Sequence, residues 1–129
     1  MTFECTLTGR PITKKNHMQL VRAGGRTVPI QSKAYKAYEA ECLCQLLMAT
    51  RLFTPYPKNA RLNLRAIYYM PDRRSRPDLV GLIQATQDIL QKARIVEDDV
   101  SFVSLDGSRI AGIDRDNPRV EIEIEEVQP

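Results

Sequence analysis

The chain has 129 residues, a length typical of one domain of roughly 100–200 residues and sufficient for a hydrophobic core without disulfides or structural metal. Its 19 Lys and Arg against 16 Asp and Glu leave a net charge of +3, so overall charge alone does not indicate a nucleic-acid-binding protein. No apolar run approaches the ~20 residues of a membrane-spanning helix, and the alternating N-terminus is neither a signal nor a transit peptide, so we expect a single cytoplasmic domain over residues 1–129.

The first predicted element is a strand over Thr2–Thr8, where apolar and polar residues alternate strictly, as in a strand with one buried face. Gly9, Arg10 and Pro11 end it. A basic loop follows over residues 13–17, and the Gly24-Gly25 pair then predicts a turn or loose hairpin.

A helix is predicted from Ser32, a residue type favoured as an N-cap, to about Leu52. Apolar residues recur at spacings of three and four, which is typical of a helix packed on a sheet. They are Tyr35, Tyr38, Cys42, Leu46 and Ala49. The three cysteines lack zinc-type spacing, Cys42 and Cys44 point to different helix faces, and buried reduced thiols are the expected state.

The second half of the chain predicts a strand, a helix and two further strands. Arg61–Met70 alternates and ends at Pro71. The next helix has Pro77 near its first turn, where the missing N–H costs little. Its apolar face consists of Leu79, Leu82, Ile83, Thr86, Ile89 and Leu90. The last strands are expected at about Val100–Leu105 and over the alternating Val120–Glu125 segment. The order β-α-β-α-β-β predicts an α/β protein of α+β type, with one mixed sheet covered by two helices.

The stretch from Met70 to Asp99 carries the residues that suggest a metal-binding or phosphate-binding site. Asp78 stands where a helix begins, and Asp99 stands at the entrance to a strand, so the two are expected to meet over one end of the sheet. Mg²⁺ takes one or two carboxylates and completes its shell with water and substrate phosphate. The structural alternatives stay open: an aspartate at a helix start complements the helix dipole, and Asp98-Asp99 is a common turn pair.

Three arginines precede that helix, and a short basic run of this kind forms either a phosphate-binding surface or a solvated loop. They are Arg73, Arg74 and Arg76.

The same stretch resembles the RusA-type Holliday junction resolvases, small phage and bacterial endodeoxyribonucleases. That family has an arginine-rich lead, an Asp-x-Asp-Asn segment opening a helix, a lysine three residues later, and an Asp-Asp pair after the helix. The matching residues here are Arg73, Arg74, Arg76, Asp78-Leu79-Val80-Gly81, Gln84 and Asp98-Asp99. Asp88 also falls where the family often has an aspartate, and the likeness extends to residues 11–16 and 117–122.

The resemblance implies a homodimer that binds four-way DNA junctions and cuts them symmetrically with Mg²⁺ or Mn²⁺. It further implies that the two aspartates of the Asp-x-Asp-Asn segment and one of the later pair hold the metal, and that the lysine stabilises charge on the scissile phosphate. Here Val80 stands at the second aspartate, Gly81 at the asparagine and Gln84 at the lysine. Of the implied set, Asp78 and Asp99 remain as catalytic and metal-binding candidates.

No other aspartate is an evident replacement ligand. Asp88 lies about 15 Å beyond Asp78 along the predicted helix, and Asp98 is expected to point away from Asp99 if both are extended. Asp72 lies in a loop whose position the sequence does not give.

Two hypotheses follow. In the favoured one, the protein binds branched DNA through basic loops, with cleavage weakened or lost. The DNA-binding candidates are Lys14, Lys15, Asn16, Arg73, Arg74 and Arg76. In the other, Asp78 and Asp99 support an active metal-dependent junction endonuclease. A dimeric phage protein without a DNA role ranks third.

Overall fold

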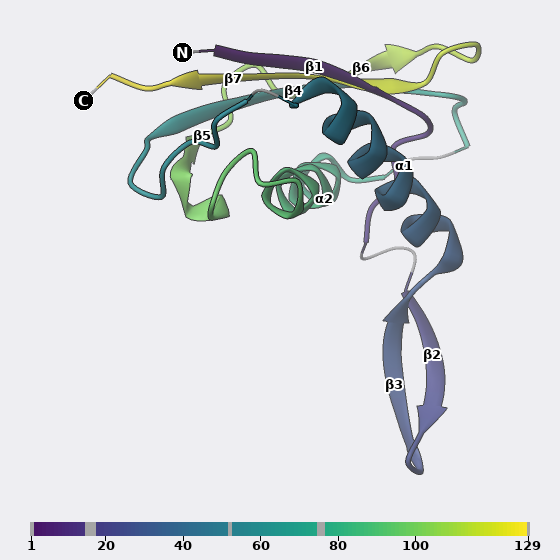
Figure 1. Cartoon of the computed structure of the whole chain (residues 1–129). Helices are drawn as coiled ribbons and strands as arrows, with labels where there is room; N and C mark the ends of the chain where they lie inside the picture. Colours follow the sequence, from purple (N-terminus) through teal and green to yellow (C-terminus); the bar gives the residue numbers. More distant parts are fainter. Residues whose placement is uncertain (1, 15–17, 52, 75–76, 129) are drawn as a thin grey trace.

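The computed structural model describes residues 2–14, 18–51, 53–74 and 77–128. It contains two long helices, one short 3-10 helix and seven strands in these ranges (Figure 1). In chain order they are β1 (Thr2–Thr8), β2 (Met18–Ala23), β3 (Arg26–Gln31), α1 (Lys33–Ala49), β4 (Leu62–Met70), α2 (Leu79–Lys92), η2 (Asp99–Ser101), β5 (Phe102–Ser104), β6 (Arg109–Ile113) and β7 (Arg119–Glu126).

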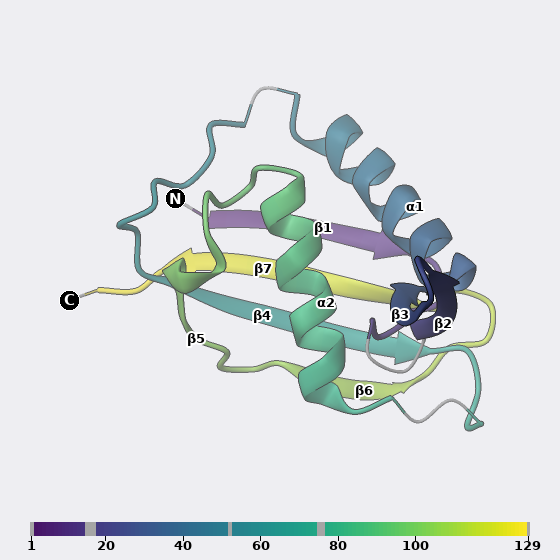
Figure 2. The ribbon, with the colours of Figure 1, turned by 90° about the horizontal axis from the view of Figure 1, so that it is seen from below.

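Five strands form one mixed sheet in the order β1-β7-β4-β5, with β6 also paired to β4. The β1–β7 and β7–β4 pairs are antiparallel, whereas β5 and β6 run parallel to β4. A parallel pair needs a crossover connection, and α2 supplies it. Both helices cover the same face of the sheet, and Figure 2 looks onto that face. The predicted mixed sheet with two covering helices is thus confirmed.

The core lies between that sheet face and the two helices. Alternate residues of β4, from Leu62 to Met70, are buried, as the strict alternation predicts. The Tyr68 hydroxyl lies 2.6 Å from the Thr86 hydroxyl of α2, so the polar end of this buried tyrosine is paired. These contacts fix α2 across the sheet, and therefore fix where its two ends lie.

The helix predictions hold closely. Ser32 caps α1 by accepting a hydrogen bond from the Tyr35 N–H at 3.1 Å, and α1 ends at Ala49 rather than near residue 52. Cys42 is buried and Cys44 exposed, so the expectation of buried thiols is wrong for Cys44, which the helix turns away from the core. In the described part of the chain, no helix is both long and apolar enough to span a bilayer.

The hairpin predicted at Gly24-Gly25 is confirmed: β2 and β3 pair on either side of this turn and form a two-stranded sheet of their own. The strand predictions need two corrections. The strand expected from Val100 begins only at Phe102, because η2 occupies the preceding residues. The sequence analysis also missed β6, whose residues are mostly exposed and show no clear alternation of buried and exposed positions.

Candidate nucleic-acid interface

The carboxyl ends of β4 and β6 lie at the same edge of the sheet, because the two strands are parallel neighbours. The Asp114 N–H donates to the Met70 carbonyl at 2.8 Å and holds the two strand ends together. The loops that leave these ends surround a depression of about 370 Å³. Its lining residues are Asp72, Arg73, Arg74, Ile113 and Arg115.

This depression joins two of the predicted DNA-binding residues to a third arginine. Arg73 and Arg74 are exposed, as phosphate contacts require. Sequence reasoning missed Arg115, which is forty-one residues beyond Arg74 and comes near it only through the β4–β6 pairing. The surface offers guanidinium groups, which match the geometry of phosphate oxygens.

Asp78 lies at the start of α2, where it acts as the N-cap. Its side chain accepts a hydrogen bond from the Gly81 N–H at 3.2 Å. A Cβ at position 81 would lie 2.7 Å from the Asp78 Oδ1 atom and 3.1 Å from the Thr13 Cγ2 atom, so glycine fits this turn closely. The cap therefore gives Asp78 a structural role in this chain.

The next positions of α2 that match the family motif carry no second carboxylate to join Asp78 at a metal. Val80 is 66% exposed and has no ligand atom. Gln84 is also exposed, one helical turn further along the same face. The exposed valine stands where the resemblance implies a metal ligand, and nothing in the fold requires an apolar side chain there.

Asp99 lies at the opposite end of α2. Its N–H donates to the Gln91 side-chain carbonyl at 3.2 Å, near the last turn of the helix. The fourteen residues of α2 separate the two ends by about 20 Å at ~1.5 Å per residue. The strand pairing agrees, because β5, which follows Asp99, pairs with Leu62 at the beginning of β4. The expectation that Asp78 and Asp99 meet over one sheet end is therefore wrong within one chain.

Asp98 and Asp99 interact with each other, contrary to the expectation of opposite orientations. Asp98 caps η2, with its side chain accepting from the Val100 N–H at 3.1 Å. This backbone hydrogen bond lowers the pKa of Asp98, and the side-chain hydrogen bond between the two carboxyl groups raises the pKa of Asp99. That expectation required both residues to be extended, whereas Asp98 is extended and Asp99 begins the 3-10 helix η2.

Lys14, one of the predicted DNA-binding residues, already forms an intramolecular ion pair. Its Nζ lies 2.8 Å from the Asp88 carboxylate, which also lies 3.7 Å from Lys92. Lys92 in turn contacts Glu39 of α1 at 3.0 Å. The Lys14–Asp88 pair holds this part of the chain, after β1, against α2. The other predicted DNA-binding residues, Lys15, Asn16 and Arg76, lie outside the described residues.

The side chains at the start of α2 do not fit the three-carboxylate metal centre that the resemblance implies. Asp78 is a single carboxylate engaged as a cap, and Val80 cannot coordinate an ion. Within the described residues, no group of three His, Cys, Asp or Glu side chains is close enough to hold a metal.

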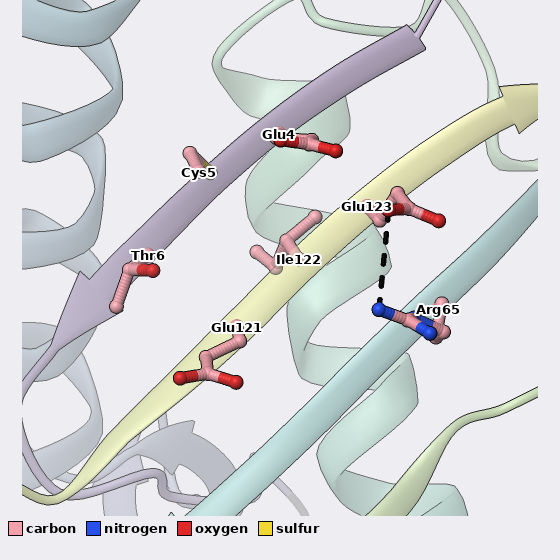
Figure 3. Close-up of a pocket in the computed structure, with 7 residues that line it drawn as sticks. All are labelled: Glu4, Cys5, Thr6, Arg65, Glu121, Ile122 and Glu123. Atoms are coloured by element: carbon pink, nitrogen blue, oxygen red, sulfur yellow. Dashed lines mark ion pairs between the residues drawn. The ribbon is translucent and has the colours of Figure 1, made fainter.

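The sheet face away from the helices is acidic. Glu4, Glu121 and Glu123 project from β1 and β7 around a hollow of about 290 Å³ (Figure 3). Arg119 lies 3.0 Å from Glu121 and Arg65 lies 3.9 Å from Glu123, so two arginines partly offset this charge. A surface of this sign repels a polyanion. The depression at the ends of β4 and β6 that is lined by Arg73, Arg74 and Arg115, hereafter the arginine edge, is therefore the better candidate for DNA contact.

Two comparisons with known proteins bear on this arrangement. Residues 8–125 match the family model described as Endodeoxyribonuclease RusA. A comparison with curated proteins gave no match.

Proposed function

The chain belongs to the RusA endodeoxyribonuclease family, and on that premise we propose that it binds four-way or other branched DNA with phosphodiester cleavage weakened or lost. The observation that carries this proposal is the contrast between two parts of one surface. The arginine edge at the ends of β4 and β6 presents the guanidinium groups of Arg73, Arg74 and Arg115. The start of α2 beside it keeps one carboxylate, Asp78, and lacks the other catalytic groups of the family.

Binding in this proposal depends on Arg73, Arg74 and Arg115. Guanidinium groups at the sheet edge contact phosphates and release counterions, so affinity falls linearly with the logarithm of salt concentration. Phosphate contacts position a protein on DNA without reading its bases, which suits a substrate defined by its branched shape. A homodimer, as the resemblance implies, would present two such edges to the arms of one junction.

Cleavage is expected to be weak for a chemical reason. Family nucleases generally depend on a divalent metal, which polarises the phosphate and lowers the pKa of the attacking water. Val80 removes a ligand and Gln84 removes a cation. The loss of one electrostatic group typically costs ~10²–10³ in rate, so the two substitutions together lower the rate by several orders of magnitude.

The alternative is an active Mg²⁺- or Mn²⁺-dependent junction endonuclease that uses Asp78 and Asp99. The two carboxylates lie about 20 Å apart in one chain by the helical rise, so an ion shared by both would need Asp78 of one protomer and Asp99 of a second copy. The third possibility, a dimeric phage protein without a DNA role, leaves the exposed arginines without a ligand.

The test measures binding and nicking of a synthetic four-way junction on the same samples, with and without Mg²⁺ or Mn²⁺. The wild type is expected to bind in a salt-sensitive way and to cut poorly. Arg73→Ala,Arg74→Ala is expected to weaken binding. The matched control, Arg51→Ala,Arg61→Ala, removes the same charge from exposed positions just after α1 and just before β4.

The outcomes separate the three possibilities. Metal-dependent nicks that Asp78→Asn abolishes would replace the proposal with the active enzyme. Equal binding by the Arg73→Ala,Arg74→Ala variant and its control would remove the arginine edge as the binding surface. No junction binding by the wild type would leave the family membership without a DNA-binding role.

A further inference from the structure

The β2–β3 hairpin projects from the body formed by the sheet and two helices (Figure 1). Its strands pair only with each other among the described elements, in a register that places Ala23 opposite Arg26. Gly24 and Gly25, with φ of 59° and 78°, form the turn, a conformation that favours glycine. Six residues per strand give an arm about 20 Å long at ~3.4 Å per residue.

The tip of this arm is positively charged and fully accessible. Residues 22–27 are all exposed, with Arg22 and Arg26 on either side of the turn. Among the residues that the structure describes, neither arginine forms an ion pair with an acidic side chain. An isolated two-stranded hairpin is only marginally stable in water. The positive charge at the tip of this projecting arm is not offset by an acidic side chain, so the arm is suited to contact a ligand of opposite charge.

The sequence around the hairpin keeps this charge free of acidic neighbours. No Asp or Glu occurs between Glu4 and Glu39. Lys33 and Lys36, at the start of α1, are exposed and extend the positive charge from the base of the arm. This part of the chain is therefore much more basic than the net charge of the whole protein suggests.

The arm lies at the same end of the sheet as the arginine edge. In both views the hairpin and the loop after β4 lie toward the end where β4 finishes (Figures 1 and 2). One contact lies directly at its base, because Ser32 caps α1 immediately after β3. On the other side, Lys14, four residues before β2, pairs with Asp88 of α2.

We infer that the β2–β3 hairpin is a second DNA-binding element, in which Arg22 and Arg26 contact the phosphates of a duplex arm of the junction. A two-stranded ribbon fits the major groove of B-DNA, so the tip can lie along a groove with its arginines on the flanking phosphates. This inference rests on the proposed function and adds to it a contact away from the arginine edge at β4 and β6.

The test compares the salt dependence of junction binding, by fluorescence anisotropy, between the wild type and Arg22→Ala,Arg26→Ala. Losing two phosphate contacts lowers the slope of log K against log salt by about 1.8, or roughly 60-fold in affinity at ~0.1 M salt. Arg22→Lys,Arg26→Lys keeps the charge and is expected to retain most of the slope. Arg51→Ala,Arg61→Ala again serves as the control of equal charge.

Hydroxyl-radical footprinting on the same complexes gives a second readout. The hairpin variant is expected to lose protection along a duplex arm and to keep protection near the crossover. Circular dichroism spectra that match the wild type would show that both variants fold.

The possible failures are distinguishable. An unchanged slope in Arg22→Ala,Arg26→Ala, together with weakened binding by Arg73→Ala,Arg74→Ala, would overturn the hairpin inference and leave the proposed function standing. A wild type that does not bind the junction would overturn both.

Discussion

The Asp78 cap yields a prediction that separates the structural role of this carboxylate from any catalytic one. Asp78→Ala removes the acceptor of the Gly81 N–H, and Gly81 is buried, so water cannot readily replace it. Loss of an N-cap costs about 1 kcal/mol, whereas asparagine caps about as well as aspartate. With an unfolding entropy of ~2.1 cal/mol/K per residue, 1 kcal/mol lowers Tm by about 4 °C for this chain.

The assay is thermal and urea unfolding of the wild type, Asp78→Ala and Asp78→Asn. We expect Asp78→Ala to be less stable by about 1 kcal/mol and Asp78→Asn to stay close to the wild type. Equal destabilisation of both variants would show that the negative charge, rather than the hydrogen bond to Gly81, stabilises the helix start. No destabilisation in either variant would refute the capping argument altogether.

Three further predictions concern other parts of the molecule. The Val80→Asp,Gln84→Lys variant is expected to stay within about 0.5 kcal/mol of the wild-type stability, because both positions are exposed. It is also expected to gain Mn²⁺-dependent nicking of a four-way junction. Unchanged nicking in a stable variant would show that these two groups do not limit cleavage. Brief alkylation at about pH 8 is expected to label Cys44 and spare Cys42, as read by peptide mass spectrometry, because burial raises the pKa of Cys42 to about 11; equal labelling in the folded protein would contradict this. The hydrogen bond from Arg119 of β7 lowers the pKa of Asp114, so the ionised carboxylate stabilises the fold above the unfolded pKa of 3.8, and this stabilisation is lost as the pH falls below that value. The free energy of unfolding is therefore expected to depend less on acidic pH in Asp114→Asn than in the wild type. Identical pH dependence in the two proteins would argue against the Asp114–Arg119 pair.

Local sequence patterns predicted the strands and the helix starts that depend on residues close together in the chain. The alternation of β4 requires one buried face, and Ser32 and Asp78 are residue types that satisfy the free N–H groups of a helix start. These features depend on neighbours within a few residues, so the sequence displays them directly.

The arrangement of the site depends on pairings between distant segments, which the sequence does not display. Arg115 joins Arg74 only because β6 lies parallel to β4. The separation of Asp78 and Asp99 follows from the return of the chain to the beginning of β4 after α2. Sequence analysis identified both aspartates, Arg73 and Arg74, but it missed Arg115. It also placed the two carboxylates together, since it had no register for β5.

The acidic sheet face described above has a kinetic consequence. A molecule with glutamates such as Glu121 and Glu123 on one face, and arginines at one end, has an uneven electric field around it. Near a polyanion this field turns the protein before contact, so that collisions through the acidic face are unproductive and those through the basic end are favoured. Neutralising the glutamates would therefore alter the rate of encounter more than the lifetime of a complex. On the proposed function, these glutamates would not contact DNA, yet they would influence how fast, and in which orientation, the protein reaches it.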